Sequence, residues 1–127
     1  MVTFTHDGMK VLCANEGEPN DAYTVDPEGT ISIIDLSQGI DQISVVSVDF
    51  HQFDGMEDSL RAANVRIFGP NASASEDFEP EYITVSSDSR WAWVSIQEAN
   101  TIAVIDIDNG MVTDLLPPRF QRPLNRG

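Results

Sequence analysis

TISIIDL at residues 30–36 and TIAVIDI at residues 101–107 are two copies of one pattern. Four of the seven positions are identical, and the other three exchange small or aliphatic side chains. A matching hairpin precedes each copy, FTHDGMKVLCA at 4–14 and VSSDSRWAWVS at 85–95. Repetition of a whole unit is typical of architectures that stack one supersecondary structure several times. The sequence therefore predicts two similar β-units.

Hydrophobic and polar residues alternate with a period of two, which is typical of half-buried strands. The strands expected are 2–5, 9–14, 30–36 and 42–50 in the first unit, and 82–86, 91–96, 101–107 and 111–116 in the second. Four sequential antiparallel strands describe one blade of a β-propeller. We therefore predict a mostly all-β chain, a fragment of a larger propeller with about two four-stranded blades. The expected division is a first blade at 1–50, an insertion at 51–81, a second blade at 82–117 and a Pro/Arg tail at 118–127.

The insertion is expected to contain one helix. Asp54 as N-cap with Glu57 three residues later has the spacing of a capping box. Leu60 and Ala63 would face inward, and Asn64 is a plausible C-cap. Residues 65–68 are expected to form a short strand or an extended packing segment. From Gly69 the insertion, rich in small and acidic residues, is expected to be a loop.

In a meander, connections alternate between the two ends of the sheet. The short turns, at 6–8, 37–41, 87–89 and 108–110, fall at one end, and the long connections, at 15–29, 51–81 and 97–100, fall at the other. Long loops held by a rigid scaffold are where function concentrates. We therefore expect the functional site at the long-loop end.

The net charge is −14, from 21 acidic and 7 basic residues. Such a field repels phosphate backbones, so a nucleic-acid partner is excluded, whereas cation binding or solubility in a salty medium fits. No apolar run reaches the length of a membrane span. The single cysteine, Cys13, excludes an intrachain disulfide and is expected to be a small buried residue. Trp91 and Trp93 share one strand face and are expected to pack between blades.

The loop at 15–29 is rich in carboxylates, which repel one another unless a cation lies among them. Calcium takes six to eight oxygen ligands, although the spacing matches no EF-hand loop. Glu81 precedes the innermost strand of the second blade, at the mouth of the propeller channel. The metal ligands proposed from the sequence are Glu16, Glu18, Asp21, Asp26 and Glu81. The alternative is a solvated acidic loop.

Further polar residues of the long loops are candidates for a ligand site. They are Asn15, Arg61, Arg66, Glu79, Glu98 and Asn100. The two arginines would clamp an anion, or alternatively neutralise nearby acids. No nucleophile elbow, phosphate loop or dinucleotide fingerprint is present, so no catalytic residue is assigned.

Long stretches of the chain resemble one known family. They are ANEGEPND at 14–21, YTVDPEGTISIIDL at 23–36, GMEDSLRAANVRIFGP at 55–70, EPEYITVS at 79–86 and QEANTIAVIDI at 97–107. They resemble the bacterial β-propeller family described as choice-of-anchor I or mesenchyme-specific cell surface glycoprotein, with some members labelled alkaline phosphatase-like. The resemblance implies a propeller of about seven blades that is exported to the cell surface, the extracellular space or the periplasm.

Two blades cannot close a ring, so their exposed sheet edges need either further sequence or another copy of the chain. If 127 residues are the whole chain, we expect self-association.

Three functions remain open at this point. The leading one is a cell-surface propeller segment whose acidic loop face binds a divalent cation and a ligand or protein partner. A metal-dependent phosphoesterase of phytase-like type is the second, with Arg61 or Arg66 neutralising phosphate. The third is a structural adhesion or scaffolding module, in which alanine at Glu16, Glu18 and Glu81 would leave binding and stability unchanged.

Overall fold

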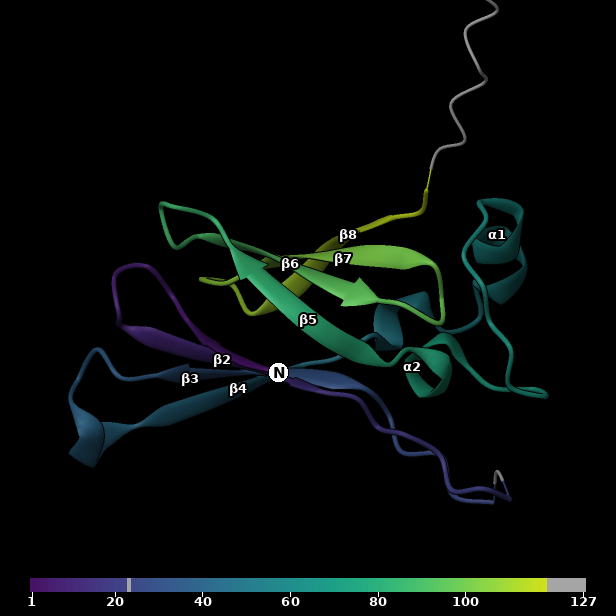
Figure 1. Ribbon diagram of the computed structural model, residues 1–127, viewed down its shortest axis with the longest axis horizontal. Coiled ribbons are helices and arrows are strands. Elements are labelled where there is room, and N and C mark those ends of the chain that lie inside the picture. Colours follow the sequence, from purple (N-terminus) through teal and green to yellow (C-terminus); the bar gives the residue numbers. More distant parts are fainter. Residues whose placement is uncertain (23, 119–127) are drawn as a thin grey trace, which may run out of the picture.

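The computed structural model describes residues 1–22 and 24–118, which form two four-stranded antiparallel sheets (Figure 1). Each sheet is a meander in which the strands follow their order in the sequence. The first sheet contains β1 (Val2–Phe4), β2 (Lys10–Asn15), β3 (Thr30–Asp35) and β4 (Ser44–Val48). The second contains β5 (Pro80–Val85), β6 (Trp91–Ile96), β7 (Thr101–Asp106) and β8 (Met111–Leu116). The predicted all-β class with two four-stranded units is confirmed.

The two units also repeat each other in their hydrogen bonds. In the first hairpin the Thr5 hydroxyl donates to an Asp7 carboxylate oxygen at 2.6 Å. In the second, the Ser86 hydroxyl donates to Asp88 at 2.5 Å. Each hydroxyl also accepts a backbone N–H five residues later, at 3.0 Å in both hairpins. A hydroxyl and a carboxylate at fixed offsets therefore build the same turn twice.

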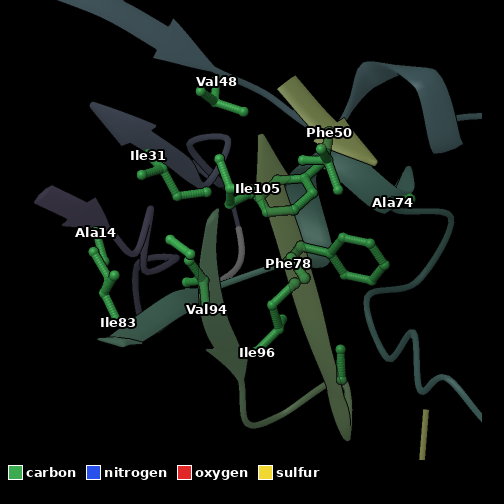
Figure 2. Close-up of a cluster of buried hydrophobic side chains, with 14 of the residues drawn as sticks. Ala14, Ile31, Val48, Phe50, Ala74, Phe78, Ile83, Val94, Ile96 and Ile105 are labelled. Carbon is green, nitrogen blue, oxygen red and sulfur yellow. The ribbon is translucent and has the colours of Figure 1, made fainter. Parts of the chain in front are cut away.

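The core lies between the two sheets, which face each other through their aliphatic side chains (Figure 2). The inner face of the first sheet contributes Leu12, Ala14, Ile31, Ile33 and Val48. The inner face of the second contributes Ile83, Ala92, Val94, Ile96, Ala103 and Ile105. Because strand side chains alternate between faces, every second residue of the inner strands enters this core.

Helix α1 (Glu57–Ala62) confirms the expected helix of the insertion but not its start. Asp54 is not the N-cap. Its carboxylate instead accepts two hydrogen bonds from Ser75, one from the backbone N–H and one from the hydroxyl, both at 2.9 Å. Leu60 is buried as expected, whereas Ala63 is exposed.

The part of the insertion from Gly69 onward was expected to be a loop, and it contains a second helix, α2 (Ala74–Asp77). Ser73 is its N-cap and forms a capping box with Glu76, so the capping-box chemistry belongs here and not at Asp54. Phe78 follows the helix and packs edge-to-face on Phe50, with the ring centroids 5.4 Å apart. The two rings extend the core toward the long-loop end (Figure 2).

The Phe50–Phe78 pair predicts a strong effect on stability. Phe78→Ala removes a fully buried ring and is expected to lower the free energy of unfolding by about 3–5 kcal/mol. Phe68→Ala, which truncates a phenylalanine that is 67% exposed, is the matched control and should change it by less than about 0.5 kcal/mol. Urea denaturation followed by circular dichroism measures both, and equal effects would contradict the assigned core.

Candidate functional site

The three long connections meet at one end of the sheets, beside α1 and α2 (Figure 1). The loop at 15–29 is tied to the insertion by Glu28, whose carboxylate lies 2.7 Å from Nε2 of His51. The insertion is tied to the connection at 97–100, because the backbone N–H of Arg66 donates to the Ala99 carbonyl at 2.8 Å. Loops that are distant in the sequence therefore form one surface.

Gly29 allows the first loop to approach the insertion closely. Its backbone N–H donates to the Ser75 carbonyl at 3.3 Å. A Cβ atom at this position would lie 1.9 Å from the Phe78 carbonyl oxygen, which is far inside van der Waals contact. Only glycine fits there without moving the backbone.

The three connections enclose a pocket of about 420 Å³. Its lining combines carboxylates with apolar and small residues: Pro19, Asp26, Phe68, Gly69, Pro70, Glu76, Asp77, Glu79 and Glu98. A concave site with an apolar wall and several convergent polar groups is the usual form of a ligand pocket. We call it the acidic pocket.

The charges of the acidic pocket repel one another. Burial raises the pKa of Glu79, and the neighbouring charges of Glu98 and Glu18 raise it further. Burial also raises the pKa of Asp26, with the charge of Glu76 adding to the effect. Within residues 1–22 and 24–118, no lysine, arginine or histidine forms an ion pair with a carboxylate of the pocket lining. The pocket thus presents a negative field that the described residues do not neutralise.

Two of the pocket carboxylates also organise the backbone. Asp77 accepts hydrogen bonds from the backbone N–H groups of Phe68, at 2.8 Å, and Gly69, at 2.6 Å. Glu76 accepts from the backbone of its N-cap, Ser73, at 3.0 Å. These bonds hold the apolar wall against α2 and so fix the shape of the pocket.

The structure separates the five metal ligands proposed from the sequence. Asp26 lines the acidic pocket, whereas Glu16, Glu18 and Asp21 are exposed on the loop. Glu81 is partly buried, and burial raises its pKa, followed by the charges of Glu98 and Glu16. In the part of the chain that the structure describes, no group of three or more His, Cys, Asp or Glu side chains is placed to hold a metal ion.

The proposed ligand-binding residues divide between two neighbouring pockets. Glu79 and Glu98 line the acidic pocket. Arg61, Arg66 and Asn100 line a second pocket of about 360 Å³, and Phe68 contributes to both. We call the second one the arginine pocket.

Asn15 lies in neither pocket. Its side-chain N–H₂ group donates to the hydroxyls of Thr30, at 3.1 Å, and Ser32, at 3.0 Å. These bonds connect β2 to β3, so Asn15 is part of the first sheet. Cys13, expected to be buried, is only partly buried on the same strand.

Sequence reasoning did not select Phe68, Gly69, Pro70, Glu76 and Asp77 as site residues. The spacing of Ser73 and Glu76 was the available signal, because it marks a helix start that turns the neighbouring acids toward one side. The apolar wall had no signal of its own, since an exposed phenylalanine is common on surfaces.

A model of the choice-of-anchor I domain family matches residues 1–118. The chain belongs to the choice-of-anchor I family. The resemblance seen in the sequence motifs is thereby confirmed, and membership indicates a domain of cell-surface-associated proteins. No curated protein and no solved structure gives a significant match. Among the described residues, no helix of this choice-of-anchor I chain is both long and apolar enough to span a membrane.

The pKa shifts predict opposite effects of two glutamate substitutions. The raised pKa of Glu79 means that its ionised form disfavours folding, so Glu79→Gln should raise Tm at pH 7. The difference should vanish below pH 4.5, the ordinary pKa, where Glu79 is protonated in the folded and unfolded states alike. Backbone N–H groups of Glu57 itself and of Gly55 lower the pKa of Glu57, whose ionised form therefore stabilises the fold.

Glu57→Gln should accordingly lower Tm at pH 7, and its effect should fade as the pH falls through the lowered pKa. Thermal melts of both variants between pH 3 and pH 7 give the comparison. A decrease in Tm for Glu79→Gln at neutral pH would contradict the description of the pocket.

Proposed function

We propose that this chain is a segment of an exported cell-surface β-propeller whose acidic pocket binds a positively charged group of a ligand or protein partner. The observation that supports the proposal best is the set of pocket carboxylates, which no cation of the described residues neutralises. Burial raises the pKa values of Asp26 and Glu79, the repulsion of neighbouring carboxylates raises them further, and a cation in the pocket would relieve that repulsion. Part of the binding energy of the cation would therefore come from removing the existing repulsion between these carboxylates.

The pocket wall supports an organic cation with an apolar stem, such as a lysine or arginine side chain. Phe68 is 67% exposed and stands beside Pro70 and Pro19. Apolar stems pack on such surfaces while the charged end meets the carboxylates, and a cation over an aromatic face gains further attraction. Calcium is the second cation proposed for this pocket, because carboxylate oxygens are its preferred ligands. Since no three acidic side chains of the described residues are placed together to hold a metal ion, water would have to supply most of its ligands.

The propeller proposal is supported by the sheets themselves. Each has the four-strand meander of a propeller blade, and the two pack face to face. In such an arrangement the connections between strands 2 and 3 and between blades lie on one rim. The acidic pocket is built from these connections.

Cation binding can be measured by NMR on the ¹⁵N-labelled chain, titrated separately with tetralysine and with calcium chloride. We expect chemical-shift changes at the amides of Phe68 and Gly69, which form the wall of the pocket. The double variant Asp26→Asn/Glu79→Gln removes two pocket charges and should weaken binding at least tenfold. Asp41→Asn, a change at an exposed carboxylate in the turn before β4, is the matched control for non-specific attraction.

The two titrants distinguish an organic cation from calcium as the ligand of the acidic pocket. Local shifts with tetralysine alone would identify an organic cation as the ligand, and local shifts that an excess of chelator reverses would identify calcium. Shifts spread over the whole surface, or equal weakening by Asp41→Asn, would overturn the proposed site.

A phosphoesterase is the second candidate, and the position of the arginine pocket favours it. Arg61 and Arg66 lie next to the acidic pocket across Phe68, so an anion and a metal ion could bind side by side. Arg61 also interacts with its own helix, with 3.3 Å between Nη1 and Asp58. The described residues provide no identified nucleophile, so a metal-bound water would have to attack the phosphate.

The corresponding experiment is hydrolysis of a chromogenic phosphomonoester with calcium or with chelator. If the chain is a phosphoesterase, Arg66→Ala should reduce kcat/KM at least tenfold, because it removes a phosphate contact. Arg90→Ala, at an exposed arginine in the opposite hairpin turn, is the control. Absence of calcium-dependent hydrolysis by the folded chain would exclude this candidate.

A further inference from the structure

The acidic pocket and the arginine pocket are neighbours, and Phe68 lines both of them. Every residue that lines either pocket belongs to a connection between strands and not to a strand. The faces of the sheets therefore take no part in this surface. The two pockets differ in charge, because carboxylates line the first and arginines line the second.

The segment at 65–68 places an arginine next to the aromatic ring that separates the pockets. Val65 and Ile67 are buried, whereas Arg66 and Phe68 are exposed, which is the alternation of an extended chain. Side chains two residues apart in an extended chain lie on the same side, with their Cα atoms about 6.6 Å apart. Arg66 and Phe68 therefore face the same side of this segment.

The turn at 97–100 contributes to both pockets and holds them together. Glu98 lines the acidic pocket, and Asn100 lines the arginine pocket. The turn is closed by the backbone N–H of Asn100, which donates to the Gln97 carbonyl at 3.0 Å. The backbone N–H of Arg66 donates to the Ala99 carbonyl of the same turn at 2.8 Å. This bond fixes the position of the arginine pocket relative to the acidic pocket.

The opposite charges of the two pockets are adjacent but do not neutralise each other. Arg61 is held by its own helix and by the neighbouring segment, with Nη1 3.3 Å from Asp58 and Nη2 donating to the Ile67 carbonyl at 3.5 Å. Among the residues that the structure describes, no ion pair joins Arg61 or Arg66 to a carboxylate of the acidic pocket. Both sets of charges therefore remain available to a ligand.

This arrangement selects ligands by the number of their charges. A ligand with a single charge is attracted by one pocket and repelled by the other, whereas a ligand with both charges is attracted by each. An arginine guanidinium binds a carboxylate through two parallel hydrogen bonds. An aliphatic stem between the two charges would pack on the Phe68 ring.

We propose, on the basis of the cation site proposed for the acidic pocket, that the two pockets form one site for a zwitterionic ligand, a basic residue at the C-terminus of a peptide. Lysine is the simplest case. Its ammonium group enters the acidic pocket, and its four-carbon stem crosses Phe68. Its α-carboxylate meets the guanidinium of Arg66 and the amide of Asn100.

Three small ligands separate the contributions of the two charges. Nα-acetyl-lysine carries both charges, its C-terminal amide carries only the ammonium group, and Nα-acetyl-norleucine keeps the stem and the carboxylate. NMR titration of the ¹⁵N-labelled chain, followed at the amides of Phe68 and Glu98, measures each dissociation constant. Nα-acetyl-lysine should bind about tenfold more tightly than either other compound, the factor that corresponds to one charge-assisted hydrogen bond.

Substitutions assign each charge of the ligand to its pocket. Arg66→Gln should remove the advantage of the free carboxylate without weakening the binding of the amide. Arg90→Gln, at an exposed arginine in a hairpin turn, makes the same change of charge and should leave the advantage intact. Glu79→Gln should weaken the binding of both lysine compounds, because it removes a charge of the acidic pocket. Circular dichroism establishes that the variants fold.

The possible results separate the zwitterion site from the function proposed for the acidic pocket. Equal affinity for Nα-acetyl-lysine and its amide, weakened in both by Glu79→Gln, would overturn the zwitterion site and leave the cation site standing. If neither lysine compound shifts the two amides, the zwitterion site and the organic-cation form of the proposed function both fail. An equal loss in Arg66→Gln and Arg90→Gln would indicate non-specific attraction and would also overturn the zwitterion site.

Discussion

The inner faces of the two sheets pack against each other through aliphatic side chains that are almost fully excluded from water. Burial of each Leu, Ile or Val side chain contributes about 1.5–3 kcal/mol. This contact holds two meanders in one relative position, and the positions of the strand ends follow from it. Phe50 and Phe78 continue the same core beneath the insertion. The loops of the acidic pocket therefore stand on a rigid base, although they contain little regular structure.

Electrostatic repulsion among the carboxylates of the acidic pocket opposes the stability that the core provides. Burial raises the pKa values of Asp26 and Glu79 in the acidic pocket, and neighbouring carboxylates raise them further. The described residues place no positive side chain in an ion pair with a carboxylate of the pocket. Elsewhere the chain uses its acids differently. Asp54 and Glu57 each accept backbone hydrogen bonds that tie α1 and its flanking segment to α2. The same residue type thus stabilises the fold at one place and reduces stability at another, which is common where a site is kept ready for a ligand.

The internal repeat relates the buried face of each sheet to the outer face of the other sheet. The strand pairs β2–β3 and β6–β7 have the same register, and the first hairpin of each unit has the same hydrogen bonds, yet aligned residues such as Leu12 and Trp93 face in opposite directions relative to the core. A pair of stacked repeats must behave in this way, because each repeat offers one face to the preceding unit and the other to the following one. The two repeats described here bury one face each against each other.

The sequence alone determined the features that depend on neighbouring residues. Alternation placed β6 and β8 at their observed limits, and the hairpin turns repeat because a hydroxyl and a carboxylate recur at fixed offsets. The partners of Asp54 and the acidic pocket were decided by the tertiary structure. Ser75 donates a hydrogen bond to Asp54 across 21 residues of sequence, and Asp26, Glu79 and Glu98 line one pocket although they come from three different connections. Such contacts form between loops whose ends the core brings together. No local pattern in the sequence encodes how close these loops lie in space.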